Sequence, residues 1–147
     1  MIVELTPRHA IEVAFNMRDI DRREVLSSCR SKTPLEFAKE CLYHGGFAVL
    51  DSTGTAVCVG GVAYQWEGVG NAWMVGTDAV YKHMIEVTRL GIKLVNDKNL
   101  RRVQAWSAAF HTDSHKWLSR IGFVEAHKLK SWGRNGEDFI LFEKFND

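Results

Sequence analysis

The feature of this sequence that most constrains its fold is a change in the spacing of its apolar residues. Between residues 7 and 44 they recur at intervals of three and four, which is the period of a helix packed on one side. Between residues 47 and 75 they fall into short runs separated by the turn-forming segments 52–54 and 68–70. Helical and strand patterns then alternate as far as residue 145. A chain with this late alternation predicts a mixed sheet that contains a parallel crossover.

The expected order is one strand, three helices, three strands, a long helix, a strand, a short helix and two strands. Thr6-Pro7 marks the start of the first helix, and the capping box Thr33-Pro34-Leu35-Glu36 marks the start of the third. The pair Gly60-Gly61, inside an expected strand, predicts a bulge or a close approach of another backbone. The strands are expected at residues 2–5, 47–51, 56–66, 72–75, 101–107, 123–131 and 137–145, and the helices at residues 7–15, 20–29, 34–44, 78–95 and 112–121.

Length and composition predict a single domain spanning residues 1–147. A chain of 147 residues buries about two thirds of the surface that it exposes when unfolded, which is enough for a core without disulfides or metals. Its 19 basic and 18 acidic side chains leave a net charge of +1, and the basic pairs Arg22-Arg23 and Arg101-Arg102 are isolated. Nucleic-acid binding depends on clustered cations, so no nucleic-acid partner is expected.

The sequence also lacks the patterns of export and membrane insertion. No apolar run approaches the ~20 residues that a membrane-spanning helix needs, so no membrane partner is expected. Residues 1–7 already include a charge and a proline, which argues against a signal peptide. The three cysteines are an odd number without a CxxC pair, which is typical of a reducing compartment. We therefore expect a cytoplasmic protein.

One short motif, together with this order of elements, resembles a known fold. Residues 115–123 read His-Lys-Trp-Leu-Ser-Arg-Ile-Gly-Phe, in which a short helix would end at Gly122 and Phe123 would enter the core. The motif and the element order resemble the GCN5-related N-acetyltransferase (GNAT) fold over essentially the whole chain. The resemblance implies an α/β fold with a mixed, mainly antiparallel central sheet flanked by helices, and a parallel crossover between the fourth and fifth strands.

A narrower resemblance rests on three further segments. Residues 73–77 (Trp-Met-Val-Gly-Thr), the pair Trp117-Leu118 and the charged segment 18–24 are similar to the small acetyltransferase-like proteins of tailed bacteriophages, which include the internal virion protein A type. This resemblance implies phage structural proteins or host proteins as partners. It also implies a place in the host cytoplasm or in the virion.

The GNAT resemblance further implies a cofactor and a substrate. In that fold the fourth and fifth strands splay apart, and the pantetheine arm of acetyl-CoA lies in the gap. The pyrophosphate lies at the start of the long helix, where backbone N–H groups hold an anion. The acyl acceptor is an amine of a small molecule or a protein. Carried over to this sequence, the cofactor-binding residues are Met74, Val75, Gly76, Thr77, His111 and His115.

The sequence departs from the acetyltransferases of this fold at positions that carry chemistry. The glycine-rich phosphate loop is reduced to Gly76-Thr77, and the negative charge of Asp78 beside it disfavours a pyrophosphate. The simpler interpretation is that Thr77 caps the following helix and Asp78 complements its dipole. The tyrosine that often protonates the departing thiolate is replaced by Leu118, which has no proton to donate.

Three residues remain as candidates for proton transfer. Tyr64 and Tyr81 are candidate acids, and Glu67 is a candidate base acting through water. Each is also typical of a surface side chain. In the charged segment 18–24, Arg18, Arg22 or Glu24 could contact an acceptor, but the mixed signs of Asp19, Asp21, Arg22, Arg23 and Glu24 are more typical of a solvated helix face.

Other chemistries have weaker support in the sequence. His111, Asp113 and His115 invite a metal site, but a common helix face is not assured and no third ligand is specified, so no metal is expected. A nucleophile at Cys29 or Cys58 would have no histidine beside it in sequence.

Two hypotheses about function stay open. The first is an acyltransferase that moves an acyl group from acyl-CoA to an amine. The second is a non-catalytic phage protein that uses the same fold in particle assembly or host interaction, with exposed tryptophans as contact residues. The candidate tryptophans are Trp66, Trp73, Trp106, Trp117 and Trp132.

Overall fold

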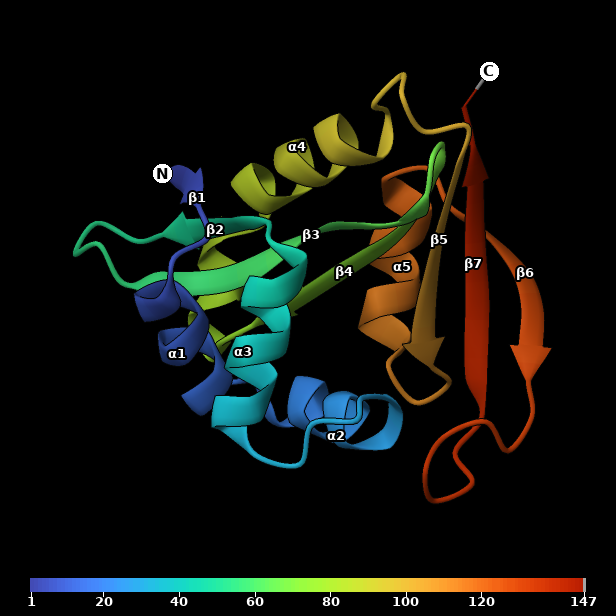
Figure 1. Ribbon diagram of the computed structural model, residues 1–147, viewed down its shortest axis with the longest axis horizontal. Helices are drawn as coiled ribbons and strands as arrows, with labels where there is room; N and C mark the ends of the chain where they lie inside the picture. The colour runs from blue at the N-terminus through green and yellow to red at the C-terminus, as the bar shows by residue number, and fades with distance from the viewer. Residues whose placement is uncertain (147) are drawn as a thin grey trace.

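Seven strands form one sheet in the computed structural model, which describes residues 1–146, and five α-helices lie against it (Figure 1). The strand order is β1-β2-β3-β4-β5-β7-β6, and every neighbouring pair is antiparallel except β4 and β5. The strands are β1 Ile2–Glu4, β2 Phe47–Leu50, β3 Ala56–Trp66, β4 Val69–Gly76, β5 Arg102–Ala108, β6 Val124–Leu129 and β7 Phe139–Phe145; the helices are α1 Pro7–Phe15, α2 Asp19–Ser28, α3 Pro34–His44, the 3₁₀ helix η1 Asp78–His83, α4 Met84–Val95 and α5 Thr112–Arg120. The expected mixed, mainly antiparallel sheet is confirmed.

The order of the elements agrees with the expectation, and two elements differ in their bounds. The strand expected at residues 72–75 begins at Val69, inside the expected turn, and the long helix begins later than expected. The sequence predicts one helix over residues 78–95, whereas residues 78–83 wind as the 3₁₀ helix η1 and α4 begins at Met84. The tighter winding carries Val80 under the end of β4, where its side chain is fully buried. Val80 lies so close to Gly76 that an added Cβ on the glycine would be 3.1 Å from it. Within residues 1–146, no helix is long and apolar enough to span a bilayer.

The glycine pair in β3 marks a close approach and not a bulge. A Cβ on Gly60 would lie 2.7 Å from the carbonyl oxygen of Trp73, and a Cβ on Gly61 would lie 3.1 Å from the Cα of Gly46. The pairing of β3 with β4 is regular through both glycines, and its register shifts only near the end of β3. The glycines therefore let neighbouring backbones pack tightly.

The two parallel strands separate soon after they meet. β4 and β5 pair only at Val69–Arg102, Gly70–Val103 and Asn71–Gln104, although both strands continue well beyond these positions. Residues 72–76 of β4 consequently have no strand partner on the side of β5. The result is a V-shaped gap in the sheet, which opens toward Gly76 and Ala108 and is visible between the β4 and β5 ribbons in Figure 1.

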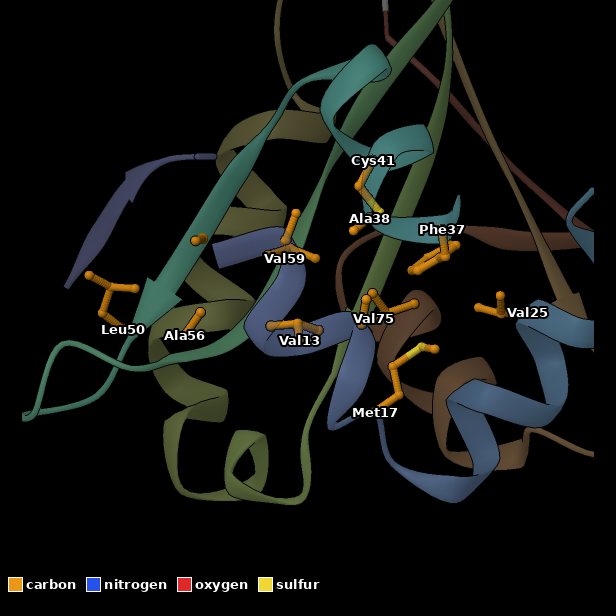
Figure 2. Packing of buried hydrophobic residues seen from close by; sticks show 13 residues of the cluster. Val13, Met17, Val25, Phe37, Ala38, Cys41, Leu50, Ala56, Val59 and Val75 are labelled. Atoms are coloured by element: carbon orange, nitrogen blue, oxygen red, sulfur yellow. The ribbon is translucent and has the colours of Figure 1, made fainter. Parts of the chain in front are cut away.

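The two faces of the sheet are covered by different helices. On one face α1, α2 and α3 pack against the sheet through a cluster that includes Val13, Met17, Phe37 and Val75 (Figure 2). On the other face α4 and α5 pack against β5 and the inner strands through two further clusters. The gap between β4 and β5 therefore lies between two helical layers.

Trp117 joins the two helices of the second face. Its indole N–H donates a hydrogen bond of 3.0 Å to the hydroxyl of Thr88 on α4. The indole ring lies over Gly91, and a Cβ added to Gly91 would be 3.0 Å from the ring carbon Cζ2. After α5, Gly122 has a φ of 111° and Phe123 is buried, so the expected glycine-aromatic helix end is confirmed.

This packing predicts that Gly91→Ala destabilises the protein, although helix propensity alone would favour alanine by about 1 kcal/mol. The new methyl group would press on Trp117, which its hydrogen bond to Thr88 holds in place, and overpacking of this kind costs about 1–3 kcal/mol. Urea-induced unfolding measures the change. In a Trp117→Leu background the same substitution should become stabilising, and a stabilising effect in both backgrounds would contradict the packing argument.

Candidate functional site

Helix α2 is attached to the open end of β4 by a buried ion pair. The guanidinium of Arg18 donates two hydrogen bonds of 2.9 Å to the carboxylate of Asp21, which is 2% exposed. Asp21 Oδ2 also accepts the backbone N–H of Gly76 at 2.8 Å, and the N–H of Arg18 donates to the carbonyl oxygen of Gly76 at 2.9 Å. The last residue of β4 is thus held by α2 where no strand is available.

The same helix is attached to the open end of β5. Oε2 of Glu24 accepts the backbone N–H of Ala108 at 2.9 Å and lies 2.9 Å from Nδ1 of His111. The buried His111 ring lies between the two carboxylates, because its Nε2 is 3.6 Å from Oδ1 of Asp21. Among residues 1–146, no donor contacts the other carboxylate oxygen of Glu24. Arg18, Asp21, His111 and Glu24 form one polar network, which we call the bridging network.

Burial and charge act in opposite directions within the bridging network. Burial raises the pKa of the Asp21 carboxyl, while the Arg18 guanidinium and the Gly76 N–H oppose this rise. Burial also disfavours the charge on Arg18, but Asp21 and Tyr81 outweigh it and raise the pKa of the guanidinium. Arg18 consequently stays a cation, and its ion pair with Asp21 neutralises its charge within the protein.

A cavity of about 420 Å³ runs through the gap between β4 and β5. It is lined by side chains from both faces of the sheet, which requires that it pass between the two strands. On the α4 and α5 face the lining is mainly apolar and includes Met74, Val87, Leu90, Leu118 and Ile121, while Asp113 and Ser114 add polar groups from the first turn of α5. On the opposite face it includes Glu24, Cys29, Glu40, Trp106 and His111. A reactive group could therefore reach the gap from each side.

A shallow depression adjoins the cavity at the start of α4. Tyr81 and Met84 line both the depression and the cavity, so the two adjoin at these side chains. The depression also contains the basic side chains of Lys82 and Arg89, and neither pairs with a carboxylate of residues 1–146. Positive charge is thus available on the surface at the outer end of the cavity.

The structure brings together only part of the proposed cofactor-binding set. Met74, Val75 and His111 line the cavity. Gly76 and Thr77 do not, and their backbone N–H groups are bonded to Asp21 and to the carbonyl oxygen of Val57. These two N–H groups therefore have partners within the protein.

Three details of the helix starts and of the second histidine correct or refine the expectation. Thr77 makes no side-chain cap, because its hydroxyl donates to the carbonyl oxygen of Val57, and the capping interpretation is wrong. Neither Thr112 nor Asp113 caps α5, since His111 occupies the capping position without a side-chain hydrogen bond. His115 lies outside the cavity lining and its Nε2 is 2.9 Å from the carbonyl oxygen of Ala108.

The three candidates for proton transfer lie in different places. Tyr81 lines the cavity, and its ring centre is 5.2 Å from the guanidinium carbon of Arg18. Tyr64 is exposed near the end of β3, and Glu67 is exposed in the turn between β3 and β4. That turn is at the closed end of the V, so Tyr64 and Glu67 lie apart from the bridging network.

The charged segment 18–24 is the site feature that the sequence-based interpretation missed. Asp19 and Arg22 are exposed as expected, but Asp21 is buried and Glu24 mostly so, and for these two the solvated face is wrong. Arg18, a candidate contact of the acceptor, is buried with them. A signal was present, since positions 18, 21 and 24 recur every three residues and therefore share one helix face. Of the five tryptophans, only Trp66 and Trp132 are exposed.

The cysteines and histidines do not form an alternative centre. Burial, followed by the charge of Glu40, raises the pKa of the Cys29 thiol to about 11, and burial raises those of Cys41 and Cys58 to about 12. All three are thus protonated, poor nucleophiles at neutral pH. Within the described part of the chain, no group of three or more His, Cys, Asp or Glu residues is arranged to hold a metal ion.

The bridging network predicts a large loss of stability for Asp21→Asn. The substitution keeps the shape of the side chain but leaves the buried Arg18 guanidinium without its counter-charge, which costs about 3–5 kcal/mol. Urea-induced unfolding provides the measurement. The matched control is Asp19→Asn. Asp19 is exposed, and its ion pair with Arg22 has an N···O distance of 3.7 Å. The free energy of unfolding of this variant should therefore stay close to that of the parent protein. Equal effects of the two substitutions would contradict the network.

The fold matches that of solved acetyltransferases, one of them described as a member of the GNAT superfamily. A phosphinothricin acetyltransferase of this superfamily from Sinorhizobium meliloti, solved with acetyl-CoA, matches with a TM-score of 0.74 at 16% identity, covering 99% of this chain and 88% of its own. A variant of spermidine N-acetyltransferase from Vibrio cholerae matches with a TM-score of 0.72 at 12% identity, over 99% and 94% of the two chains. Ribosomal-protein-S5-alanine acetyltransferase from Vibrio fischeri matches with a TM-score of 0.71 at 20% identity, over 99% and 92%.

The likeness is one of structure. No sequence model of a protein family matches the chain, and no curated protein matches it in sequence. The chain therefore has the GNAT fold, and its activity has to be argued from its own site.

Proposed function

We propose that this protein is an N-acyltransferase that moves an acyl group from acyl-CoA to an amine. The observation that carries the proposal is the cavity through the V-shaped gap, which is mainly apolar on the α4 and α5 face and bears Glu24 and His111 on the other. In acyl transfer the acyl donor and the amine acceptor have to meet at one point, so the cavity has to admit them from two sides. The acetyltransferases with the same fold support this use of the gap.

The residues around the cavity fit acetyl-CoA, which supplies the acyl group as a thioester when bound. The apolar side chains Met74, Leu90 and Leu118 would hold the pantetheine arm. The phosphates would lie on Lys82 and Arg89 in the adjoining depression, because the N–H groups of Gly76 and Thr77 already have partners. This arrangement replaces a backbone phosphate loop with side-chain cations.

Glu24 is the residue best placed to receive the acceptor. An alkylamine arrives protonated, with a pKa of about 10.4 for a lysine, and has to lose a proton before it can attack. The carboxylate oxygen of Glu24 that has no protein donor would bind the ammonium group and take this proton, while His111 and the Ala108 N–H hold the other oxygen. As the C–N bond forms and the C–S bond breaks, the Tyr81 hydroxyl would give a proton to the sulfur, and the second proton lost by the nitrogen would restore the tyrosine through solvent. Glu24 would then release its proton to solvent, so the products are the amide, the thiol and one proton.

This role predicts that Glu24→Gln lowers kcat/KM by about a hundredfold to ten-thousandfold, the usual contribution of a general base. Glutamine can still accept the Ala108 N–H, so the fold and the affinity for acetyl-CoA should persist. Thiol release with an amine acceptor measures turnover, and calorimetry measures acetyl-CoA binding. Glu125→Gln, at an exposed position on β6, is the matched control.

The pH profile gives a second readout of the same role. Because the acceptor ammonium has a pKa of about 10.4, activity should rise with pH in both proteins, and the loss in the glutamine variant should be largest at neutral pH, where the acceptor most needs a base. Full activity of a folded Glu24→Gln protein would overturn the assignment, and failure of the parent protein to bind acetyl-CoA at millimolar concentration would overturn the proposed function.

The phosphate assignment predicts that Lys82→Ala and Arg89→Ala each weaken acetyl-CoA binding by about tenfold, the usual effect of losing a hydrogen bond to a charged group. Binding of acetyl-pantetheine, which lacks the nucleotide phosphates, should be unchanged. Calorimetry at low and high salt measures both ligands. Lys93→Ala, at an exposed position farther along α4, is the control, and a loss of equal size there would contradict the assignment.

A second role, in phage particles or in host interaction, rests on the narrower sequence resemblance and on one surface feature. Tyr64 and Trp66 are 55% and 62% exposed and lie two residues apart on β3, away from the bridging network. Exposed aromatic side chains of this kind are common in protein contacts. Detection of the protein in purified particles or in a stable host complex would support this role, with the host cytoplasm or the virion as its location.

A further inference from the structure

The ring of His111 faces a carboxylate at each of its two nitrogens. Nδ1 lies 2.9 Å from Oε2 of Glu24, and Nε2 lies 3.6 Å from Oδ1 of Asp21. The His111 side chain is 6% exposed, so water is largely excluded from both contacts. Turning the ring over would place carbon atoms against both carboxylates, which supports this orientation of the nitrogens.

These contacts favour a ring that carries two protons. An ionised carboxylate only accepts hydrogen bonds, whereas a neutral imidazole has a single N–H to donate. One nitrogen of a neutral His111 would therefore present a lone pair to a negatively charged oxygen. The imidazolium has a donor for Glu24 and a positive charge for Asp21 at the same time.

The charge of the bridging network favours the same protonation state. Arg18 supplies one positive charge, and the carboxylates of Asp21 and Glu24 supply two negative charges. With a neutral His111 the network would have a net charge of minus one, and a second proton on the ring brings it to zero. A net charge inside a protein is unfavourable, so the empty site favours the imidazolium.

No lysine or arginine of residues 1–146 supplies this balancing charge in place of His111. None of them lies within ion-pair distance of Glu24. The neighbouring Arg23 is exposed, and its guanidinium carbon lies 4.3 Å from the ring centre of Phe110. The ring of His111 is therefore the group that can balance Glu24 from within this part of the chain.

Three further titratable side chains lie around the network. The ring centre of Tyr81 is 5.2 Å from the guanidinium carbon of Arg18, Asp113 lines the cavity from α5, and His115 is hydrogen-bonded to the end of β5. In the described part of the chain, none of them makes a hydrogen bond or an ion pair with the His111 ring. The negative charge of Asp113 adds to the preference for a cation.

The proposed acceptor brings a second cation to the same carboxylate. An ammonium group on the oxygen of Glu24 that has no protein donor would restore the balance of charge without the second ring proton. Imidazolium and ammonium together would leave a net charge of plus one, with two cations repelling each other across one carboxylate. A ring that keeps only its Nδ1 proton still donates to Glu24, so the carboxylate stays in place.

We infer that His111 is a positioning residue for Glu24 that holds a proton in the empty site and releases it when the acceptor ammonium binds. Protonated protein and ammonium thus give the complex and one proton in solvent, which balances the exchange. The inference rests on the proposed function for the place of the acceptor at Glu24. By linkage, the affinity for an amine should rise with pH by up to about tenfold per unit, as long as the empty protein holds the proton and the complex does not.

The first test is nitrogen-15 NMR of the histidine rings in the whole protein at neutral pH. Without ligand, both ring nitrogens of His111 should show the signature of an imidazolium. Saturating butylamine should convert the ring to the neutral form with its proton on Nδ1. This test needs no variant, and a neutral His111 ring in the ligand-free protein would overturn the inference.

The second test is calorimetry of butylamine binding, without acyl-CoA, in buffers that differ in their enthalpy of ionisation. Butylamine stays protonated at neutral pH, so any proton that appears comes from the protein. The parent protein should release about one proton for each amine bound.

His111→Asn is the matched variant, because asparagine keeps a neutral N–H donor for Glu24 but cannot take a second proton. It should bind butylamine without proton release, and its affinity should no longer change with pH. His127→Asn, at an exposed position on β6, should behave like the parent protein. Thermal unfolding of each variant confirms that it is folded.

The outcomes separate this inference from the proposed function. Proton release on amine binding, without acyl transfer from acetyl-CoA, would support the role of His111 and overturn the acyltransferase. Acyl transfer together with amine binding that releases no proton would support the acyltransferase and overturn the inference. Equal proton release by the parent protein and by a folded His111→Asn protein would also overturn the inference.

Discussion

The hydrogen bonds from the backbone ends of β4 and β5 to two carboxylates of α2 are the interactions on which the site depends. Strands that separate leave N–H groups without a ladder partner, and each such group costs about 1–3 kcal/mol if it is buried and unbonded. Asp21 takes the N–H of Gly76 and Glu24 takes the N–H of Ala108, so the sheet stays open without leaving these donors unpaired. On one side of the sheet, the two carboxylates of α2 stabilise the gap. On the other side, the hydrogen bond from Trp117 to Thr88 joins α5 to α4.

These structural contacts also determine what chemistry is available. Glu24 uses one carboxylate oxygen to hold β5 and leaves the other without a protein donor, so a residue required for the fold is already positioned for a ligand. The absence of a base on β4 and the leucine at position 118 then count less against catalysis. In the proposed function, proton transfer would be supplied from α2 and η1, through Glu24 and Tyr81, which both line the cavity.

Several parts of the fold follow from local patterns, whereas parts of the site do not. The element order, the helix end at Gly122 and the divergence of the fourth and fifth strands agree with the expectation. The start of the long helix does not, because burial of Val80 under Gly76 favours a 3₁₀ winding that helical periodicity cannot reveal. Thr77 likewise has the residue type of a cap, but a strand carbonyl 20 positions earlier in the chain takes its hydroxyl.

The sequence by itself determined which segments form strands and helices, and hence a mixed sheet with one parallel crossover, because the spacing of apolar residues is a local property of the chain. Only the tertiary structure decided that Asp21 and Glu24 belong to a polar network with Arg18 and do not lie on a solvated charged face. Their environment is set by Gly76, Ala108 and His111, which are 55 to 90 positions away in sequence. Whether a charged side chain is buried depends on partners far away in sequence, so the residue type alone does not reveal its burial.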